Sequence, residues 1–279
     1  MLDKKIKVKE IQDLGARNYL LTLHSPEQAR LTRPGQFLMV KCAEDVQANP
    51  LLRRPFSVFD TRRHPRSGKH FALDILVKDV GEGTRWLSRL NPGDQVHTLG
   101  PQGIPFKVRP EMCDRKHIAC LIAGGVGIAA LLLLARELIL NQVTPILFYG
   151  GRTDADLVLK EHFEQLGIEV SYTTEDGSLG ARGLVTEALE RFLRTRSREN
   201  KHIYVCGPWA MMKASHQIAA RYGIPCEVSL EARMGCSLGA CMGCVVHAWD
   251  SRGEEQYLRV CLEGPVMESR SIDWDTPPL

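Results

Sequence analysis

Apolar residues gather in short stretches through roughly the first 108 positions, and polar, turn-forming segments separate them. The stretches have strand-like composition. They predict β-strands at 6–8, 19–23, 37–40, 56–59, 71–77 and 95–99. Turn signals rich in proline and glycine separate several of them, and one short helix is expected at 83–90. Short strands at this spacing indicate an antiparallel β-barrel, with a sandwich as the alternative.

The pattern changes at about residue 117, where apolar runs begin to alternate with segments of helical periodicity. The runs predict strands at 117–122, 145–149, 169–173, 203–206 and 226–230. The segments between them predict helices at about 127–141, 155–166, 183–195 and 209–222. This alternation indicates a parallel sheet with crossover helices, an α/β domain of the nucleotide-binding type. After residue 230 both signals weaken.

Three domains follow from these patterns and from a length of 279 residues, which exceeds one ordinary domain. We expect an all-β fold combined with an α/β fold. Residues 1–110 would form the antiparallel β-barrel, residues 111–225 a Rossmann-like parallel α/β domain, and residues 226–279 a small cysteine-rich module. A module of that size usually needs a metal or another staple to stay folded.

Composition and charge narrow the class of protein. With 44% hydrophobic and 25% charged residues, the chain is an ordinary soluble globular protein rather than a disordered or fibrous one. The net charge of +3 is spread over both halves, which argues against nucleic acid as a ligand. The longest apolar run, at 128–134, is far shorter than the roughly 20 residues of a membrane span. Charges at 3–5 lie where a secretory signal needs apolar residues, so we expect a cytoplasmic protein.

Nine cysteines are present, and four of them lie between residues 236 and 261. Their spacing, C-x4-C-x2-C followed by a distant fourth cysteine, is the plant-type arrangement for a [2Fe–2S] cluster. The four metal ligands would be Cys236, Cys241, Cys244 and Cys261. Small residues beside them allow backbone amides to approach the cluster sulfurs. They are Gly235, Gly239, Ala240 and Gly243.

Structural zinc is the alternative for this motif, although zinc ribbons normally contain two short cysteine pairs and this segment contains one. Four cysteines elsewhere show no metal-binding spacing, and we expect them to be buried as small hydrophobic side chains. They are Cys42, Cys113, Cys120 and Cys226.

A glycine-rich segment lies between an apolar strand and a long helix, and its members are Gly124, Gly125, Val126, Gly127 and Ile128. Its glycines resemble the dinucleotide fingerprint, in which amides at a helix N-terminus bind a diphosphate. A tight structural turn is the alternative. The acidic residue expected about 20 positions later is not clear, because Arg152 occupies that point and Asp154 follows it. The choice between NAD and NADP therefore stays open.

Cys206, Gly207 and Pro208 end another predicted parallel strand, at the edge where open α/β sheets bind their ligands. A sharp turn there would expose the backbone to a planar ring. A plain turn with proline at the first helical position is the alternative. The segment 173–178 ends the preceding strand, and it either lines the same crevice or forms a solvated loop.

Two segments of the barrel carry candidate diphosphate ligands. One is 53–57, where Arg54 offers a charge-assisted hydrogen bond and Ser57 a hydroxyl for a polar ring edge. The other is 80–84, where Gly83 and Thr84 open a helix. Taken alone, both segments would be ordinary surface ends of strands.

In chain order, these motifs resemble the ferredoxin–NADP reductase superfamily, in which a flavin-binding barrel precedes a pyridine-nucleotide domain. The resemblance covers essentially the whole chain. A closer resemblance, to the electron-transfer subunits of type B dihydroorotate dehydrogenases, rests on the cluster motif, on 227–236 leading into it, and on 260–266 around the fourth cysteine. Those proteins add a C-terminal [2Fe–2S] module.

The resemblance implies which residues hold FAD and NAD(H). FAD would be held by Arg54, Pro55, Phe56, Ser57, Leu76, Val77, Lys78, Gly81, Gly83 and Thr84. The nicotinamide nucleotide would be held by the segment 124–128 together with 206–208. Simple reductases of the superfamily often end in an aromatic residue that stacks on the flavin, whereas this chain ends in 276–279 after the cluster module.

The resemblance also implies an electron relay. A nicotinamide exchanges a hydride, whereas an iron–sulfur cluster exchanges single electrons, so a flavin must connect them. In the family the relay serves an FMN-containing catalytic subunit that oxidises dihydroorotate in pyrimidine biosynthesis, with NAD as the final acceptor. A hetero-oligomer is therefore expected, and no catalytic acid or base is assigned in this chain.

Two other functions stay open from the sequence. The first is the same relay in a hydrogenase-like, sulfide-linked or ferredoxin-linked complex. The second is a non-catalytic zinc protein that uses its α/β domain as a nucleotide sensor.

Overall fold

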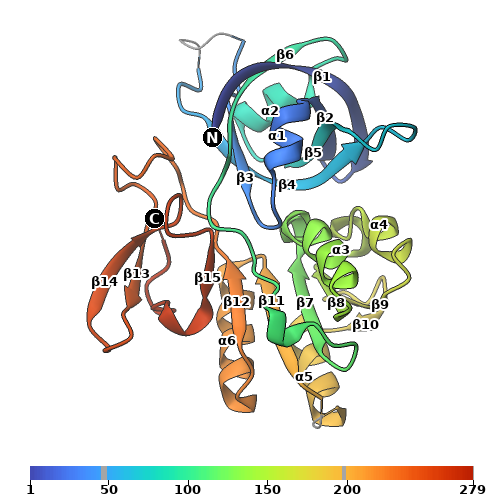
Figure 1. The fold of residues 1–279 in the computed structure, drawn as a ribbon, viewed down its shortest axis with the longest axis vertical. Helices are drawn as coiled ribbons and strands as arrows, with labels where there is room; N and C mark the ends of the chain where they lie inside the picture. The colour runs from blue at the N-terminus through green and yellow to red at the C-terminus, as the bar shows by residue number, and fades with distance from the viewer. Residues whose placement is uncertain (45–48, 197–198, 279) are drawn as a thin grey trace.

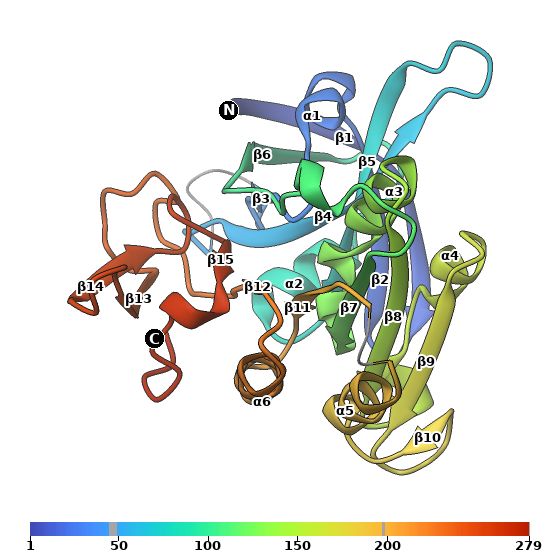
Figure 2. The same cartoon turned by 60° about the horizontal axis from the view of Figure 1, so that its bottom comes forward.

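The computed structural model describes residues 1–44, 49–196 and 199–278. The chain folds into a β-barrel, a parallel sheet with helices on both faces, and a C-terminal segment beside one edge of that sheet (Figure 1). Figure 2 shows that the barrel lies across one end of the sheet. No helix within the described ranges is long and apolar enough to cross a membrane.

Six antiparallel strands close the barrel in the order β1-β2-β5-β4-β3-β6. They are β1 (Leu2–Gly15), β2 (Asn18–His24), β3 (Phe37–Val40), β4 (Arg54–Arg63), β5 (His70–Lys78) and β6 (Gln95–Gln102). Leu21, Leu38 and Ile75 are fully buried in its interior. The predicted antiparallel barrel is confirmed, and each predicted strand is present.

Two short helices pack against the barrel, α1 (Pro26–Leu31) and α2 (Glu82–Ser88). The sequence predicted α2 but not α1, because six residues are too few to show helical periodicity. Tertiary contacts hold α1 in place. The buried side chain of Gln28 donates to the carbonyl of Gly100 at 3.3 Å and accepts from the hydroxyl of Thr98 at 3.1 Å.

The second sheet has seven strands in the order β10-β9-β8-β7-β11-β12-β15. They are β7 (Ile118–Gly124), β8 (Thr144–Gly151), β9 (Glu169–Thr174), β10 (Ala181–Arg182), β11 (Lys201–Cys206), β12 (Cys226–Ser229) and β15 (Val266–Glu268). All neighbours are parallel except β12 and β15. The strand order reverses between β7 and β11, so their carboxyl ends form the switch point at which such sheets bind ligands.

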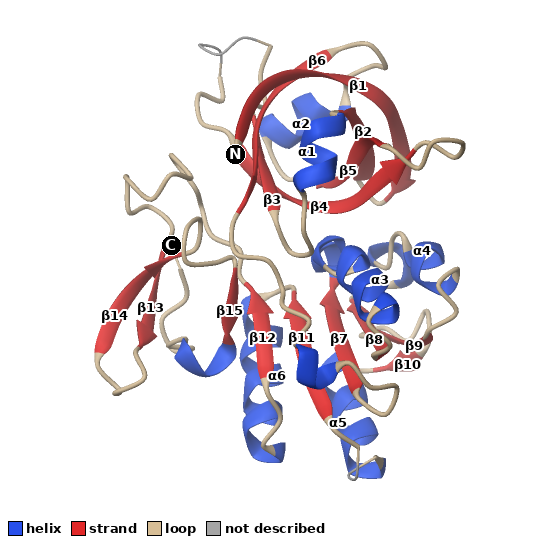
Figure 3. Cartoon of the chain, in the orientation of Figure 1, coloured by secondary structure: helices blue, strands red, loops and turns tan. Residues whose placement is uncertain are grey.

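Helices cover both faces of this sheet (Figure 3). They are α3 (Leu132–Leu140), α4 (Lys160–Glu164), α5 (Val185–Thr195) and α6 (Trp209–Tyr222). Alternate residues of β7 point to opposite faces, so Cys120 packs with residues of α5 and α6, whereas Leu121 packs with residues of α3 and α4. The predicted parallel α/β domain is confirmed.

Two helix predictions need correction. The helix expected at 127–141 begins as a 3-10 turn, η2 (Gly125–Ala130), and α3 follows it. Gly125 has a φ of +50°, which lies outside the range of a regular α-helical turn. The helix expected at 155–166 is a 3-10 turn, η3 (Asp154–Asp156), followed by the short α4.

After β12 the chain forms a hairpin of β13 (Val245–Trp249) and β14 (Glu255–Arg259), and then β15 returns to the main sheet. The 3-10 turn η4 (Ser269–Ser271) follows. The predicted cysteine-rich module, 226–279, thus contributes β12 and β15 to the seven-stranded sheet. Cys244 and Cys261 share one hydrophobic core with Ile203 and Val228 of the sheet.

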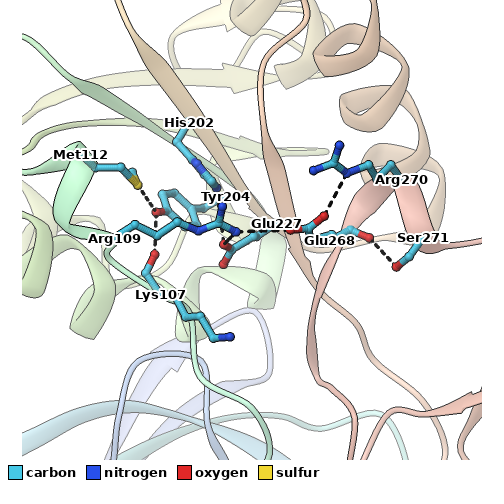
Figure 4. Close-up of polar contacts among 9 residues, drawn as sticks. All are labelled: Lys107, Arg109, Met112, His202, Tyr204, Glu227, Glu268, Arg270 and Ser271. Atoms are coloured by element: carbon cyan, nitrogen blue, oxygen red, sulfur yellow. Dashed lines mark hydrogen bonds and ion pairs between the residues drawn. The ribbon is translucent and has the colours of Figure 1, made fainter. Parts of the chain in front are cut away.

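The segment that joins β6 to β7 contains the 3-10 turn η1 (Pro110–Met112) and is fixed to three strands by polar contacts (Figure 4). The guanidinium of Arg109 lies 3.4 Å from the carboxylate of Glu227 in β12 and 3.3 Å from that of Glu268 in β15. The hydroxyl of Tyr204 in β11 donates to the carbonyl of Lys107 at 3.1 Å. The path from the barrel to the sheet is therefore held by side chains of the sheet.

Candidate functional site

Two cavities meet where the barrel, the carboxyl ends of the sheet strands and the cysteine-rich loop come together. The larger has a volume of about 1090 Å³ and the smaller about 510 Å³. Lys78, Val126 and Glu231 line both cavities, so the two spaces share a wall. The smaller lies within the range of about 300–1,000 Å³ expected of small-molecule sites, and the larger is slightly above it.

The barrel contributes most of the predicted FAD residues to the larger cavity. Its lining includes Arg54, Pro55, Phe56, Ser57, Leu76, Lys78, Gly81, Gly83 and Thr84. Val77 is an exception, because neighbouring residues of a strand point to opposite sides and the side chain of Val77 is fully buried in the barrel core. The two predicted barrel segments therefore face one space.

Local contacts shape this part of the wall. The guanidinium of Arg54 donates to the carbonyl of Leu52 at 2.9 Å, which holds the half-buried side chain at the rim. The hydroxyl of Thr84 accepts from the amides of Val80 and Gly81 at 2.9 and 3.1 Å, so it orders the turn that enters α2.

The glycine-rich segment and the end of β11 form the smaller cavity. Its lining includes Gly124, Gly125, Val126, Gly127, Gly207 and Pro208. A Cβ on Gly127 would lie 2.2 Å from the carbonyl oxygen of Cys206, so this position has no room for a side chain. The predicted neighbours Ile128 and Cys206 are buried behind the wall rather than lining it, and burial raises the pKa of the Cys206 thiol.

Sequence reasoning did not single out two carboxylates of these walls. Glu231 follows β12 at the carboxyl edge of the sheet and is exposed to the space of both cavities. The protein packed around its carboxyl group limits the access of water and raises its pKa. Asp156 lines the smaller cavity from η3, two residues after Asp154. The position of Glu231 directly after a parallel strand was the available signal.

The four predicted metal ligands lie in the loop after β12 and just after β14. Backbone amides point at their sulfurs: Leu238 N–H lies 3.3 Å and Cys241 N–H 3.4 Å from the Sγ of Cys236, and Gly243 N–H lies 3.5 Å from the Sγ of Cys241. Amides so placed stabilise a thiolate, and those of Leu238 and Cys241 lower the pKa of Cys236 to about 6. Such N–H groups are what the sulfurs of an iron–sulfur site need around them.

The four thiols are arranged as two pairs in this structure. Cys236 contacts Cys241, and Cys261 contacts Cys244. Burial, together with the neighbouring Cys244 thiol, raises the pKa of Cys261 to about 12. Within the described part of the chain, no three ligand side chains converge on one metal-ion position. Two pairs suit a two-iron cluster, in which each iron takes two protein ligands, better than a single zinc ion.

Gly239 allows the loop to turn. Its φ of +77° lies in the left-handed region, and a Cβ there would come within 3.0 Å of Leu262 and 3.2 Å of the Arg259 guanidinium. Arg259 donates to the carbonyl of Gly239 at 3.0 Å and pairs with Glu263. These contacts fix the loop to the segment that carries Cys261.

The cysteine loop also borders the larger cavity, because Gly235 and Gly243 form part of its wall. Pro278 lines the same cavity, so the C-terminal segment returns to it. That segment is anchored by Trp274, whose ring packs 4.7 Å from that of Trp209 in α6. The three candidate sites are therefore contiguous, in the order smaller cavity, larger cavity, cysteine loop.

The other cysteines divide into two groups. Cys42, Cys120 and Cys226 are buried, as predicted. The prediction was wrong for Cys113, which is exposed because it follows η1 on the surface of the connecting segment.

Two family models match the chain. The oxidoreductase NAD-binding domain matches residues 121–217, and the iron-sulfur cluster binding domain of dihydroorotate dehydrogenase B matches residues 231–273. Two similar proteins are dihydroorotate dehydrogenase B (NAD(+)) electron transfer subunits. That of Desulforamulus reducens is 37% identical and covers 96% of this chain and 97% of its own length. That of Geobacillus kaustophilus is 36% identical and covers 93% and 94%.

Solved structures show the same architecture. The structure of an NADH-dependent reduced ferredoxin-NADP oxidoreductase matches with a TM-score of 0.81 and 29% identity, over 97% of this chain and 90% of that one. A ferredoxin NADP+ reductase from Neisseria gonorrhoeae, solved with bound FAD and NADP, matches with a TM-score of 0.63 and 15% identity, over 79% and 92%. At that identity the second match concerns the fold alone.

Proposed function

The chain belongs to the family of dihydroorotate dehydrogenase B (NAD(+)) electron transfer subunits, and from this premise we propose that it relays electrons between NAD(H), FAD and a [2Fe–2S] cluster for a catalytic partner subunit. The observation that carries the proposal is the contiguity of the sites. The two cavities share Lys78, Val126 and Glu231 in their walls, and Gly235 and Gly243 of the cysteine loop line the larger one.

The order of the sites suits the chemistry of the three groups. A nicotinamide exchanges a hydride and an iron–sulfur cluster exchanges single electrons, so a flavin supplies the step between them. Of the two cavities, only the larger borders both the smaller cavity and the cysteine loop. The residues of this chain bind, orient and exclude water, and a hydride transfer needs no general acid or base among them.

We assign each site to the residues predicted for it. Within the barrel domain, 1–110, the candidates Arg54, Ser57 and Thr84 would hold FAD with their neighbours along the wall. Within 111–225, the loop 124–127 and the turn at Gly207 would hold NAD(H). Within 226–279, the ligands would be Cys236, Cys241, Cys244 and Cys261, and the amides directed at their sulfurs support this assignment.

We propose that the partner is an FMN-containing catalytic subunit and that it docks over the cysteine loop. Cys241 is exposed, and three exposed apolar side chains surround it along the chain, Leu238, Met242 and Leu262. Leu262 lies against the loop at Gly239, so these side chains belong to one face. We also propose a cytoplasmic location, because clustered cysteines need a compartment that keeps thiols reduced.

The test is an anaerobic absorption spectrum of the purified chain with iron, sulfide and flavin assays, recorded before and after NADH is added. Overlapping flavin and iron–sulfur bands that bleach with NADH support the relay. Cys241→Ser is expected to remove the iron–sulfur bands and leave FAD bound, whereas Cys113→Ser, at an exposed cysteine outside the loop, is the matched control. Folded protein without flavin or iron, or a normal cluster in Cys241→Ser, contradicts the assignment.

A second candidate function is the same relay in a ferredoxin-linked complex. The full-length similarity to the NADH-dependent reduced ferredoxin-NADP oxidoreductase structure, at a TM-score of 0.81, favours it. Isolation of the native complex distinguishes the two functions. A partner that contains FMN and oxidises dihydroorotate supports the first, and a partner that exchanges electrons with ferredoxin supports the second.

A further inference from the structure

An ion pair joins the barrel to the α/β domain inside the smaller cavity. The ammonium of Lys78, at the end of β5, lies 3.1 Å from the carboxylate of Asp156 in η3. Both side chains are largely sheltered, with exposed fractions of 29% and 13%. Lys78 also lines the larger cavity, so this contact lies in the shared wall.

A second cation approaches the same carboxylate. The Nε of Arg152, just after β8, lies 3.6 Å from the other oxygen of Asp156. Lys78 and Arg152 are the two basic residues among the described residues that line the smaller cavity. Both of them are therefore paired with one carboxylate, and both are side chains of the kind that binds phosphate groups.

Asp156 is held firmly in this position. The hydroxyl of Tyr149 lies within hydrogen-bond distance of three backbone carbonyls, those of Gly125 and Val158 at 3.1 Å and that of Asp156 at 3.3 Å, so this turn packs against the glycine-rich segment. Burial opposes ionisation of Asp156, but the hydrogen bond from Lys78 and the charges of Lys78 and Arg152 outweigh it and lower the pKa of the carboxyl. The cavity thus contains a fixed negative charge next to its two cations.

We propose that the carboxylate of Asp156 pairs with Lys78 and Arg152 in the smaller cavity until a phosphate group of NAD(H) displaces it from them. The inference rests on the proposed function, because it requires that NAD(H) binds in this cavity. Because the phosphate must compete with this carboxylate for the two cations, the nucleotide binds more weakly. Bound and free nucleotide therefore exchange more rapidly. Since Lys78 belongs to the barrel and Asp156 to the α/β domain, each binding event also breaks a contact between these two parts.

The test compares Asp156→Asn with the unaltered chain, both loaded with FAD. The dissociation constants of NADH and of NADPH are measured by titration, with the fluorescence of the nucleotide as the signal. Removing the charge frees both cations, so NADH is expected to bind about 2- to 5-fold more tightly, the range of a partly exposed ion pair. NADPH carries one more phosphate and is expected to gain more than NADH. Asp156→Glu keeps the charge and is expected to restore weaker binding.

Asp154→Asn is the matched control, because Asp154 lies in the same turn but pairs with Lys160 at 2.7 Å and does not line the cavity. Its affinity for NADH is expected to equal that of the unaltered chain. If Asp156→Asn does not fold, Asp156→Ser removes the same charge with a smaller side chain. Unchanged or weaker NADH binding by the charge-free variant overturns the inference. Absence of NADH binding by the unaltered, FAD-loaded chain overturns the proposed function instead.

Discussion

Replacement of Gly127 by alanine tests whether the switch point is built for close backbone contact. A Cβ at this position would lie 2.2 Å from the carbonyl oxygen of Cys206, 2.5 Å from its carbonyl carbon and 2.7 Å from the amide nitrogen of Gly207. All three are backbone atoms, so no flexible side chain can move aside. The glycine-rich segment must separate from the end of β11, which widens the wall of the nucleotide cavity.

Overpacking of this kind costs about 1–3 kcal/mol of unfolding free energy. For a protein of this size that corresponds to a fall of about 3–10 °C in Tm. We also expect Gly127→Ala to lose most of its affinity for NADH, because the displaced segment carries the amides that face the cavity. Thermal unfolding followed by circular dichroism and a fluorescence titration with NADH measure the two effects.

Gly125→Ala is the matched control, two residues away in the same turn. A Cβ at Gly125 meets no atom within 4 Å, and only its φ of +50° disfavours a side chain. The expected cost is therefore about 1 kcal/mol. If Gly127→Ala melts at the temperature of the unaltered chain and binds NADH equally well, the close approach of the two segments is not a requirement of the site.

Three further changes probe the other parts. Arg54→Ala is expected to weaken FAD retention about 10- to 100-fold through loss of a charge-assisted contact, measured as flavin remaining after gel filtration, whereas Arg53→Ala, whose guanidinium pairs with Asp3, should retain FAD. The raised pKa of Glu231 makes the chain lose stability as pH rises above the ordinary glutamate value of 4.5, so Glu231→Gln should flatten the dependence of Tm on pH, and an unchanged slope would contradict this. Trp274→Ala should lower the free energy of unfolding by about 3–5 kcal/mol, because the ring is buried against Trp209. Urea unfolding measures the loss, and Trp249→Ala, at an exposed ring, is the control.

The elements that the sequence predicted are those whose signal is local. The predicted strands of the barrel and of the parallel sheet each contain enough apolar residues to show a pattern, and all of them are present. β10 was not predicted, because its two exposed residues show no such pattern. β15 has three residues and exists because it pairs with β12. Val266 lies opposite Ser229, 37 positions earlier in the chain, so no local pattern could reveal this strand.

Most residues of the predicted motifs line the two cavities, but the motifs did not resolve which of their members face the open space. Ile128 and Cys206 belong to the predicted segments and are buried behind the cavity wall, because a tight turn points only some of its members inward. Asp156 acquires its place from Lys78, which is 78 positions away in the chain and in another part of the fold. A contact of that kind depends on how the barrel meets the sheet, which no local pattern encodes.

The hydrophobic core that Cys244 and Cys261 share with Ile203 and Val228 limits how this chain can be rearranged. The cysteine loop cannot be transplanted as an independent unit, because its two buried cysteines pack on the edge of the seven-stranded sheet. A chimera that borrows the loop must also borrow β12, β15 and the α6 surface beneath them. If the partner docks over the cysteine loop as proposed, only the exposed face of the loop is available to change partner specificity, because the buried face is fixed by its packing on the seven-stranded sheet.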